Sequence, residues 1–257
     1  MRVAVLSSGG KDSAYAVWWA LLNGWDVAMI VTVRVNADDS MMFQREGTAI
    51  AGVQAAAAGI PWLPILDSNT EGIDALEQGL EPFVRGSIWP RSSLWSQSDI
   101  LNANWPEWSC NKPIHARPGA PIEAIVSGAL RSDYQRVRID MMANRLGIAS
   151  FSPLWHMPAH IHMNNLIQSN FDVRFTAVSA EGIDSTWLGR KLDNDCISDL
   201  ATLEDQFGIN VDGEGGEFET TVLSAPWFDS LEWETKAEWG KNRGSLDIID
   251  VWKSNNP

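Results

Sequence analysis

The strongest chemical signal in the sequence is a glycine-rich string near its amino terminus. The string is Ser7-Ser8-Gly9-Gly10-Lys11-Asp12-Ser13, and it follows an apolar run that is typical of a buried strand. Glycines let the backbone turn sharply and bring its N–H groups against an anion, and a following helix points its positive end at the same place. Two serine hydroxyls and the Lys11 ammonium add donors for phosphate oxygens. The carboxylate of Asp12 could orient the loop or help to hold Mg²⁺. The string therefore predicts a nucleotide-binding loop.

Two better-known phosphate loops do not match this string. A Walker A loop needs a glycine where Val5 stands, and Asp12 separates Lys11 from Ser13 where that loop needs them adjacent. The dinucleotide pattern GxGxxG is absent as well. The remaining plain alternative is an ordinary strand-to-helix turn that contains two glycines.

A second unusual string lies far along the chain. It reads Gly213-Glu214-Gly215-Gly216-Glu217-Phe218-Glu219-Thr220, with three glycines among three glutamates. Glycine permits close approach of a backbone, and the carboxylates could bind a cationic group. An acidic hairpin turn is the plain alternative.

Three histidines form an HxxxHxH cluster at His156, His160 and His162. The first two could share one helix face, as in some zinc sites. However, Pro158 interrupts that helix, and no convincing carboxylate or cysteine partner follows nearby. We therefore expect a structural or surface role rather than metal binding.

A helix predicted over Arg131 to Leu146 carries two further cations. Arg136 and Arg138 are two residues apart and lie well separated around a helix, so only one is expected to face a site. As a simple amphipathic helix, this segment would turn Tyr134, Val137 and Met141 toward the core.

Several strings resemble those of a known family. Ser8 to Ser13 matches the SGGxDS motif of the PP-loop ATP pyrophosphatases. Ser127 to Arg138 resembles the GAIxSDYQRxR segment of diphthine–ammonia ligases, and Gly213 to Thr220 resembles their GEGGEYET signature. Met42-Phe43-Gln44 is similar to their MYQ string. The resemblance runs from residue 1 to about Pro226, apart from Arg85 to Pro121.

This resemblance implies an ATP-dependent C–N ligase that converts diphthine on translation elongation factor 2 into diphthamide with ammonium. The carboxylate would be activated as an acyl-adenylate, with release of pyrophosphate and then AMP. Diphthine carries a quaternary ammonium and an imidazole, so acidic groups suit it by charge.

The implied catalytic residues are Lys11, Asp12 and Arg136, with Asp12 also the Mg²⁺ ligand. The implied ATP-binding residues are Ser8, Gly9, Gly10, Lys11, Asp12, Ser13 and Gly128. The implied acceptor-binding residues are Tyr134, Gln135, Glu214, Gly215, Gly216, Glu217, Glu219 and Thr220.

The sequence departs from the family pattern at Asp212, where a cysteine is usual, and at Met157, where a basic residue is common. A fold also does not fix a function. One alternative is a PP-loop ligase or sulfur transferase that acts on tRNA or on a small carboxylate, although the paired cysteines of such sulfur transferases are missing. Another is a nucleotide-binding module without catalysis.

The elements that would position these residues alternate between strands and helices in the first half, which predicts an α/β fold with a parallel sheet. Residues 1–152 are expected to form the PP-loop nucleotide-binding domain, and 153–257 a smaller α+β acceptor-binding domain with a C-terminal extension. The expected strands are Arg2–Ser7, Asp26–Val33, Trp62–Leu66, Ile122–Ser127, Ile148–Phe151, Asp172–Ser179 and Phe218–Ser224. The expected helices are Ser13–Leu22, Met41–Ala58, Glu71–Val84, Arg131–Leu146, Pro158–Ser169 and Asp195–Phe207.

The alternation fails between Arg85 and Pro121. This stretch contains five prolines and four tryptophans, and a structureless loop of that length is uncommon in a compact domain. Disordered segments are usually poor in aromatic residues. We expect an insertion packed on the surface, with a lid over the site as the alternative.

Charge and composition limit the classes of partner. The net charge of −14 argues against broad binding to nucleic acid. The two cysteines, Cys110 and Cys196, belong to no CxxC pair, so a disulfide framework or zinc knuckle is not expected. The first residues suggest a strand rather than a signal peptide, and the apolar runs are too short or too broken to span a bilayer, so we expect a cytoplasmic protein. The sequence leaves the source of ammonia and formation of a homo-oligomer open.

Overall fold

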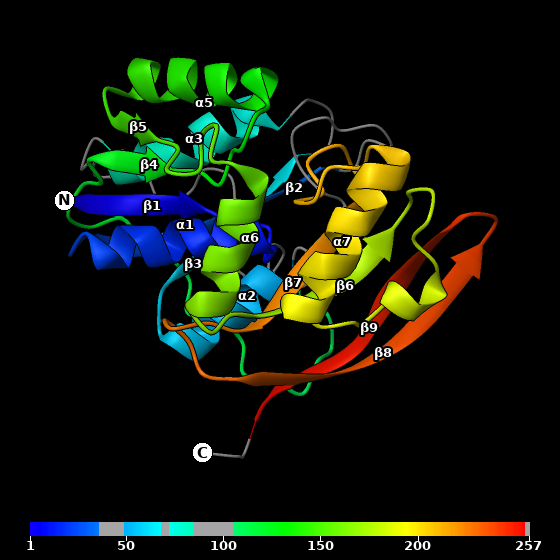
Figure 1. Cartoon of the computed structure of the whole chain (residues 1–257). Coiled ribbons are helices and arrows are strands. Elements are labelled where there is room, and N and C mark those ends of the chain that lie inside the picture. Colours follow the sequence, from blue (N-terminus) through cyan, green and yellow to red (C-terminus); the bar gives the residue numbers. More distant parts are fainter. Residues whose placement is uncertain (36–48, 68–71, 85–104, 255–257) are drawn as a thin grey trace.

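The computed structural model describes residues 1–35, 49–67, 72–84 and 105–254. Its strands form two sheets, one parallel and one antiparallel, and helices pack around both (Figure 1). The Met42-Phe43-Gln44 string and residues 85–104 of the Trp- and Pro-rich stretch lie outside the described residues.

The first sheet is parallel and has the strand order β3-β2-β1-β4-β5. Its strands are β1 (Arg2–Leu6), β2 (Asp26–Val35), β3 (Trp62–Asp67), β4 (Ala124–Val126) and β5 (Ala149–Phe151). Helices α1 (Lys11–Leu22) and α2 (Ile50–Ala58) contribute to the apolar cluster on one face, and α3 (Ile73–Val84) and α5 (Asp133–Leu146) to the cluster on the other. Strands covered on both faces are rich in Val and Ile, as in β1 and β2. The predicted α/β fold is confirmed.

Helix α5 shows which of its residues form the buried stripe. Ile139, Met142, Ala143 and Leu146 are buried at helical spacing. Val137 and Met141 are 50% and 57% exposed, so the expectation that they point to the core is wrong. The four buried positions follow one face of the helix continuously, whereas Val137 and Met141 lie around its side.

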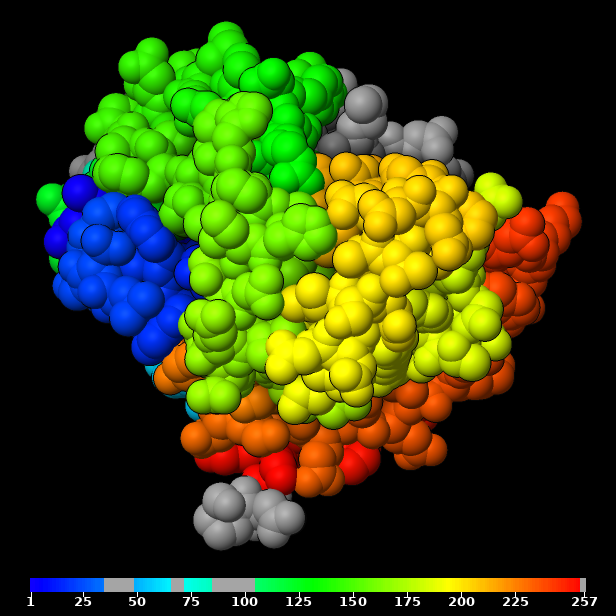
Figure 2. Space-filling model, in the orientation of Figure 1, coloured from blue at the N-terminus to red at the C-terminus, as the bar shows by residue number. Residues whose placement is uncertain are grey.

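The second sheet is antiparallel, with the strand order β7-β6-β9-β8. Its strands are β6 (Asp172–Val178), β7 (Phe218–Ser224), β8 (Leu231–Gly240) and β9 (Arg243–Lys253), accompanied by α6 (Ala159–Gln168), η1 (Ser185–Trp187) and α7 (Asn194–Phe207). Figure 2 shows α6 and α7 side by side on the surface in the view of Figure 1. The long β8–β9 hairpin was not predicted, because its alternating charged and aromatic residues leave most of both strands partly or fully exposed.

One apolar cluster joins the two sheets. It contains Val3 and Val5 of β1 together with Phe175 of β6 and Val222 of β7. Trp227, which follows β7, donates from its indole nitrogen to the carbonyl of Ala14 at 3.1 Å. The antiparallel sheet is therefore packed directly onto the α1 and α2 side of the parallel sheet. None of the described helices is long and apolar enough to cross a membrane.

The second part of the Trp-rich segment packs into this cluster. Trp105 is 9% exposed, and its ring lies 5.8 Å from that of Trp62 at an interplanar angle of 67°. The backbone of Trp62 also accepts from Ala116 at 2.9 Å and donates to Ile114 at 2.7 Å, which extends pairing beyond the edge of β3. The expectation of a purely surface insertion is wrong for Trp105. The indole fills space above Gly52, where an added Cβ would lie 2.8 Å from it.

Candidate active site

A cavity of about 300 Å³ lies at the carboxyl ends of β1 and β4. In the order β3-β2-β1-β4-β5 the winding reverses between these two strands, where open α/β sheets bind ligands. The polar residues and glycines lining the cavity are Ser7, Ser8, Gly10, Lys11, Asp12, Ser13, Ser127, Gly128, Gln135, Gly213, Glu214, Gly216, Glu219 and Thr220. The glycine-rich loop and the glutamate-rich string thus face one space.

The two loop glycines are required for different reasons. Gly9 has φ of +88°, and an added Cβ would lie 2.1 Å from Cγ2 of Ile50. Gly10 has an extended backbone with φ of −79°, so its backbone angles suit any residue. There, however, an added Cβ would lie 3.2 Å from the carbonyl oxygen of Thr220. Backbone conformation requires glycine at position 9, and the close approach of β7 favours it at position 10.

Strand β7 holds this loop from the other half of the chain. The amide of Val222 donates to the carbonyl of Gly9 at 3.1 Å, and the amide of Lys11 donates to the hydroxyl of Thr220 at 3.3 Å. Gln54, fully buried on α2, donates from Nε2 to the carbonyls of Gly9 and Val222 at 2.9 and 2.8 Å. The loop conformation is therefore set jointly by both sheets.

The amino end of α1 is suited to an anion. Gly10 is the N-cap and has no side chain with which to cap the helix, and the first helical amide, that of Lys11, donates to the hydroxyl of Thr220 on β7. The hydroxyl of Ser13 donates to the Gly10 carbonyl at 3.0 Å, on the cavity side. The remaining amides of the first turn, together with the helix dipole, favour phosphate. Gly128 follows β4 and would place a Cβ 2.7 Å from the Asp12 carbonyl carbon, so only glycine lets this strand end approach the helix.

Lys11 and Asp12 form a charged pair at the cavity wall. The Lys11 ammonium is 3.0 Å from Oδ2 of Asp12, and the Lys11 side chain is 6% exposed. Oδ1 of Asp12 is 2.7 Å from Nε2 of His162. Burial alone raises the pKa of Asp12, but the charge of Lys11 and the contact with His162 more than offset it, so the pKa lies below its ordinary value. Asp12 is therefore a carboxylate at neutral pH.

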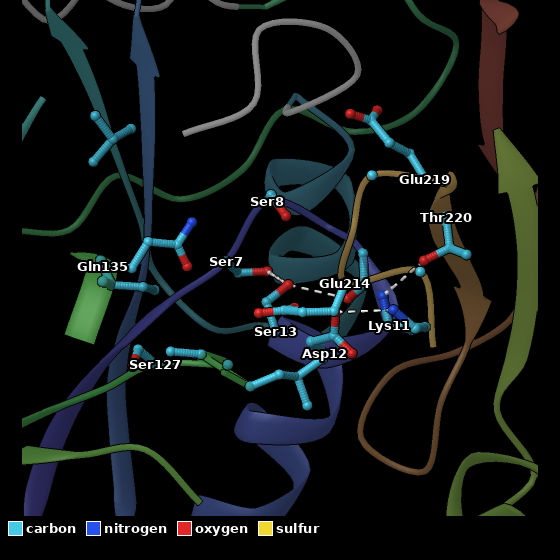
Figure 3. A pocket seen from close by; sticks show the side chains of 18 of the residues that line it. Ser7, Ser8, Lys11, Asp12, Ser13, Ser127, Gln135, Glu214, Glu219 and Thr220 are labelled. Atoms are coloured by element: carbon cyan, nitrogen blue, oxygen red, sulfur yellow. Dashed lines mark hydrogen bonds and ion pairs between the residues drawn. The ribbon is translucent and has the colours of Figure 1, made fainter. Parts of the chain in front are cut away.

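A second carboxylate, Glu214, lies beside this pair. Its Oε1 accepts from the Arg131 amide at 3.1 Å. Burial raises the pKa of Glu214, and the nearby charge of Asp12 adds to the rise. Figure 3 shows Lys11, Asp12, Ser13 and Glu214 gathered at one place in the cavity.

A buried ion pair fixes the start of the glutamate-rich string. Asp212 is fully buried, and its two carboxylate oxygens accept from Nη2 of Arg131 at 2.5 and 2.6 Å. Asp212, which stands where the family usually has a cysteine, thus carries a negative charge that is neutralised by Arg131 of the Ser127 to Arg138 string. Removing one partner of such a pair leaves an uncompensated buried charge.

The glutamate side chains of the Gly213 to Thr220 string do not all face the cavity. Glu219 lines the cavity. In Figure 3, Glu219 and Gln135 lie on different sides of the place where Lys11 and Glu214 meet. Glu217 does not line it; its Oε1 accepts from the amide and side chain of Asn210 at 2.8 and 2.6 Å. An added Cβ at Gly215 would lie 2.6 Å from that carboxylate, so Gly215 permits the bracing contact.

The side chains near the start of α5 also point in different directions. Gln135 lines the cavity. Tyr134 is covered by the Arg138 guanidinium, 3.4 Å from its ring centroid. Arg136 faces a second cavity, where it lies 4.5 Å from the Trp155 ring centroid and 3.4 Å from Asp140. The structure therefore separates Arg136 and Tyr134 from the phosphate loop.

The three histidines do not converge on a metal. His160 contacts Glu204 at 3.0 Å on the surface, His156 packs against Trp155, and His162 meets Asp12. Within the described ranges, no three His, Cys, Asp or Glu side chains are grouped closely enough to hold a metal by themselves. Mg²⁺ commonly needs only one or two carboxylates when phosphates supply other ligands. Asp12 and Glu214, both in the cavity wall, fit that requirement.

Sequence reasoning missed Arg131, Asp212, Gln54 and the contact of His162. The histidine cluster and the unusual Asp212 were visible signals, but their partners were not. Gln54 gave no signal, because an amide within an alanine-rich helix has no distinctive spacing.

Comparison with known proteins assigns both halves of the chain to one family. The family model described as diphthamide synthase N-terminal domain matches residues 1–81, and the diphthamide synthase C-terminal domain matches residues 158–253. A diphthine–ammonia ligase of Rattus norvegicus is 30% identical over 236 residues, covering 89% of this chain and 80% of that protein. The Homo sapiens protein of the same name is 29% identical with the same coverage. The one from Saccharomyces cerevisiae is 26% identical, and the match covers 98% of this chain but 35% of that longer protein.

Proposed function

Because the chain belongs to the diphthamide synthase family, we propose that it is an ATP-dependent ligase that amidates diphthine on translation elongation factor 2. In the first step a carboxylate oxygen of diphthine attacks the α-phosphorus of ATP, and pyrophosphate leaves. In the second step ammonia, formed from ammonium by loss of a proton, attacks the acyl carbon, and AMP leaves. The activation is needed because a carboxylate has no good leaving group for ammonia.

The observation that carries this proposal is the shared cavity. The phosphate loop lines one wall, and Glu214, Gly216 and Glu219 line another. One half of the chain can therefore bind the nucleotide where the other presents groups for an acceptor. Such positioning, with charge stabilisation at phosphorus, supplies most of the catalysis that this chemistry requires.

The loop residues have separate roles in the proposed reaction. The amides in the first turn of α1 and the hydroxyl of Ser8 bind phosphate oxygens, and Lys11 contributes positive charge. The hydroxyl of Ser13 donates to the Gly10 carbonyl and so supports the loop. Asp12 would hold Mg²⁺, assisted by Glu214; the bound ion would neutralise phosphate charge. Thr220 contacts the loop backbone, so it supports the loop as well as bordering the acceptor side.

On the acceptor side, Glu219 and Gln135 lie at the cavity wall, and Glu219 is exposed. A carboxylate there suits the quaternary ammonium of diphthine. Glu217 braces its own loop, so its proposed contribution to acceptor binding is indirect. Direct roles for Arg136 and Tyr134 and the division into domains 1–152 and 153–257 stay predictions.

The products of ATP cleavage test the proposed reaction. With ammonium and diphthine-bearing elongation factor 2, we expect AMP and pyrophosphate in equal amounts and diphthamide on the factor by mass spectrometry. Omitting the factor or ammonium should abolish diphthamide formation. ADP as the main product would contradict adenylation. AMP formation with tRNA or a small carboxylate, but not with the factor, would favour another PP-loop ligase, and no cleavage with any acceptor would favour a binding module.

A matched pair of substitutions tests the acceptor side. Glu219→Gln keeps size but removes charge, so with saturating ATP we expect the KM for elongation factor to rise about tenfold, as for loss of one charged contact. Glu234→Gln, on the exposed face of β8 outside the cavity, serves as the control. ATP affinity measured by titration calorimetry should be unchanged in both. Equal kinetics in the two variants would show that Glu219 does not contact the acceptor.

A further inference from the structure

We propose that His162 is a positioning residue that holds the Asp12 carboxylate in place from the opposite half of the chain. His162 lies on α6, and its side chain is fully buried. Its Nε2 is 2.7 Å from Oδ1 of Asp12, 150 residues earlier in the chain. The Asp12 side chain is 29% exposed, so its carboxylate is reached both from the cavity and from α6.

The contact has a defined direction. An ionised carboxylate only accepts hydrogen bonds, so the proton must be on Nε2 of His162. The other oxygen of Asp12 lies 3.0 Å from the Lys11 ammonium. Each oxygen is thus held by a different side chain, one from the loop and one from α6. Two separate donors fix the rotation of the carboxylate as well as its position, which one donor would not do.

The other ring nitrogen supports the same assignment. Nδ1 of His162 is buried and has no hydrogen-bond partner among the residues that the structure describes. A proton there would be an unsatisfied buried donor, which costs more than a bare acceptor in the same place. The ring also packs at 90° against Tyr15, with centroids 5.4 Å apart, which limits its reorientation. The environment therefore favours the tautomer that donates to Asp12.

A histidine that only filled space in the core would not need to direct an N–H donor at a carboxylate. Its neighbour His160, on the same helix, is half exposed and contacts Glu204 on the surface instead. His162 differs in aiming its polar edge at the carboxylate of the phosphate loop. Side chains that orient such a ligand from behind commonly change activity or metal affinity by about 10–100-fold when removed. The consequence for turnover rests on the proposed function, whereas the tautomer and the contact do not.

Two substitutions separate positioning from packing. His162→Gln keeps an N–H donor at nearly the reach of Nε2, and His162→Leu keeps bulk without a donor; both residues suit a helix. In AMP formation, we expect His162→Leu to lower kcat about tenfold or more and to raise the Mg²⁺ requirement, with ATP affinity little changed. His162→Gln should restore most of kcat. The same two changes at His160 are the matched controls and should leave both parameters near wild type.

Nitrogen-15 NMR of the imidazoles provides a readout that needs no catalysis. We expect the His162 signals to show a protonated Nε2 and an unprotonated Nδ1, and the Nε2 proton to shift in Asp12→Asn. A proton on Nδ1, or His162→Gln as impaired as His162→Leu, would overturn the proposal. If the expected tautomer and shift are seen but wild type forms no AMP with any acceptor, the positioning contact stands and the proposed function fails.

Discussion

At the scale of single residues, the cavity holds two carboxylates with opposite tendencies. Lys11 and His162 keep the pKa of Asp12 below its ordinary value despite burial. Burial and the charge of Asp12 raise the pKa of Glu214. Without a bound cation, Glu214 therefore lies in an environment that disfavours its charge. A bound cation would favour the ionised form of both carboxylates.

Replacing Glu214 with Gln should reveal this as a pH-dependent change in stability. A carboxyl group whose folded pKa is raised contributes stability fully below its ordinary value of 4.5, and that contribution is lost as the pH rises through the folded pKa. Gln does not titrate. The free energy of unfolding of Glu214→Gln, relative to wild type, should therefore increase as the pH rises from the ordinary value of 4.5 through the folded pKa. Urea denaturation at several pH values measures it.

Glu234→Gln, the same substitution on exposed β8, gives the background pH dependence for this comparison. A relative stability of Glu214→Gln that decreases as the pH rises would contradict the expectation. It would mean that the amide of Arg131 stabilises the ionised carboxylate more than burial disfavours it.

At the scale of elements, the segment before β4 is inserted between α3 and β4 and also contributes to the core. The amide of Ile122 donates to the carbonyl of Phe83 at 2.9 Å, so the chain leaves α3 and returns beside it. That geometry is typical of an insertion. Yet Trp105 belongs to the main apolar cluster, and Ser109 and Asp250 bring the segment against β9. Trp105 thus stabilises the fold and does not line the cavity.

Trp105→Ala should lower the free energy of unfolding by about 3 kcal/mol, because a large buried side chain leaves a cavity against Trp62 and Gly52. Trp239→Ala removes the same side chain at a position that is 44% exposed, and a change within about 0.5 kcal/mol is expected there. Urea denaturation of both variants checks the difference. Equal losses would show that Trp105 is not a core residue. In either variant the nucleotide affinity should persist under conditions where the protein is folded.

At the scale of the whole molecule, the two sheets share one core and one loop. Apolar residues of β1, α1, α2, β6 and β7 belong to a single cluster. Backbone hydrogen bonding between Val222 and Gly9 joins the two sheets at the glycine-rich loop. The half that carries the glutamate-rich string is therefore part of the scaffold of the glycine-rich loop, in addition to its proposed role toward the acceptor.

We expect the chain to unfold in one cooperative transition. Because removing either sheet would expose the shared cluster, neither half should be stable while the other is unfolded. Tryptophan fluorescence and far-ultraviolet circular dichroism, followed in urea, should give coincident curves. Separate midpoints for the two probes would show that the halves fold independently and that their contacts contribute little.

The sequence by itself determined the local elements and the position of the glycine-rich loop. Apolar strands with Val and Ile, helices ended by Gly59 and Gly147, and the glycine-rich string after the first strand depend on neighbours in the chain, so their patterns are visible in it. The resemblance of four strings identified the family, which the comparisons then showed. The β8–β9 hairpin escaped prediction because its exposed faces carry little hydrophobic pattern.

Only the tertiary structure decided which distant residues meet. Thr220 contacts Lys11 across 209 residues, and His162 contacts Asp12 across 150. The structure also separated Glu217 from Glu219: one braces a turn and the other borders the cavity. Such differences depend on the register of β7 and on how the antiparallel sheet packs against α1, and neither leaves a periodic trace in the sequence. The chemistry of the loop is therefore local, whereas the partners that orient it are set by packing.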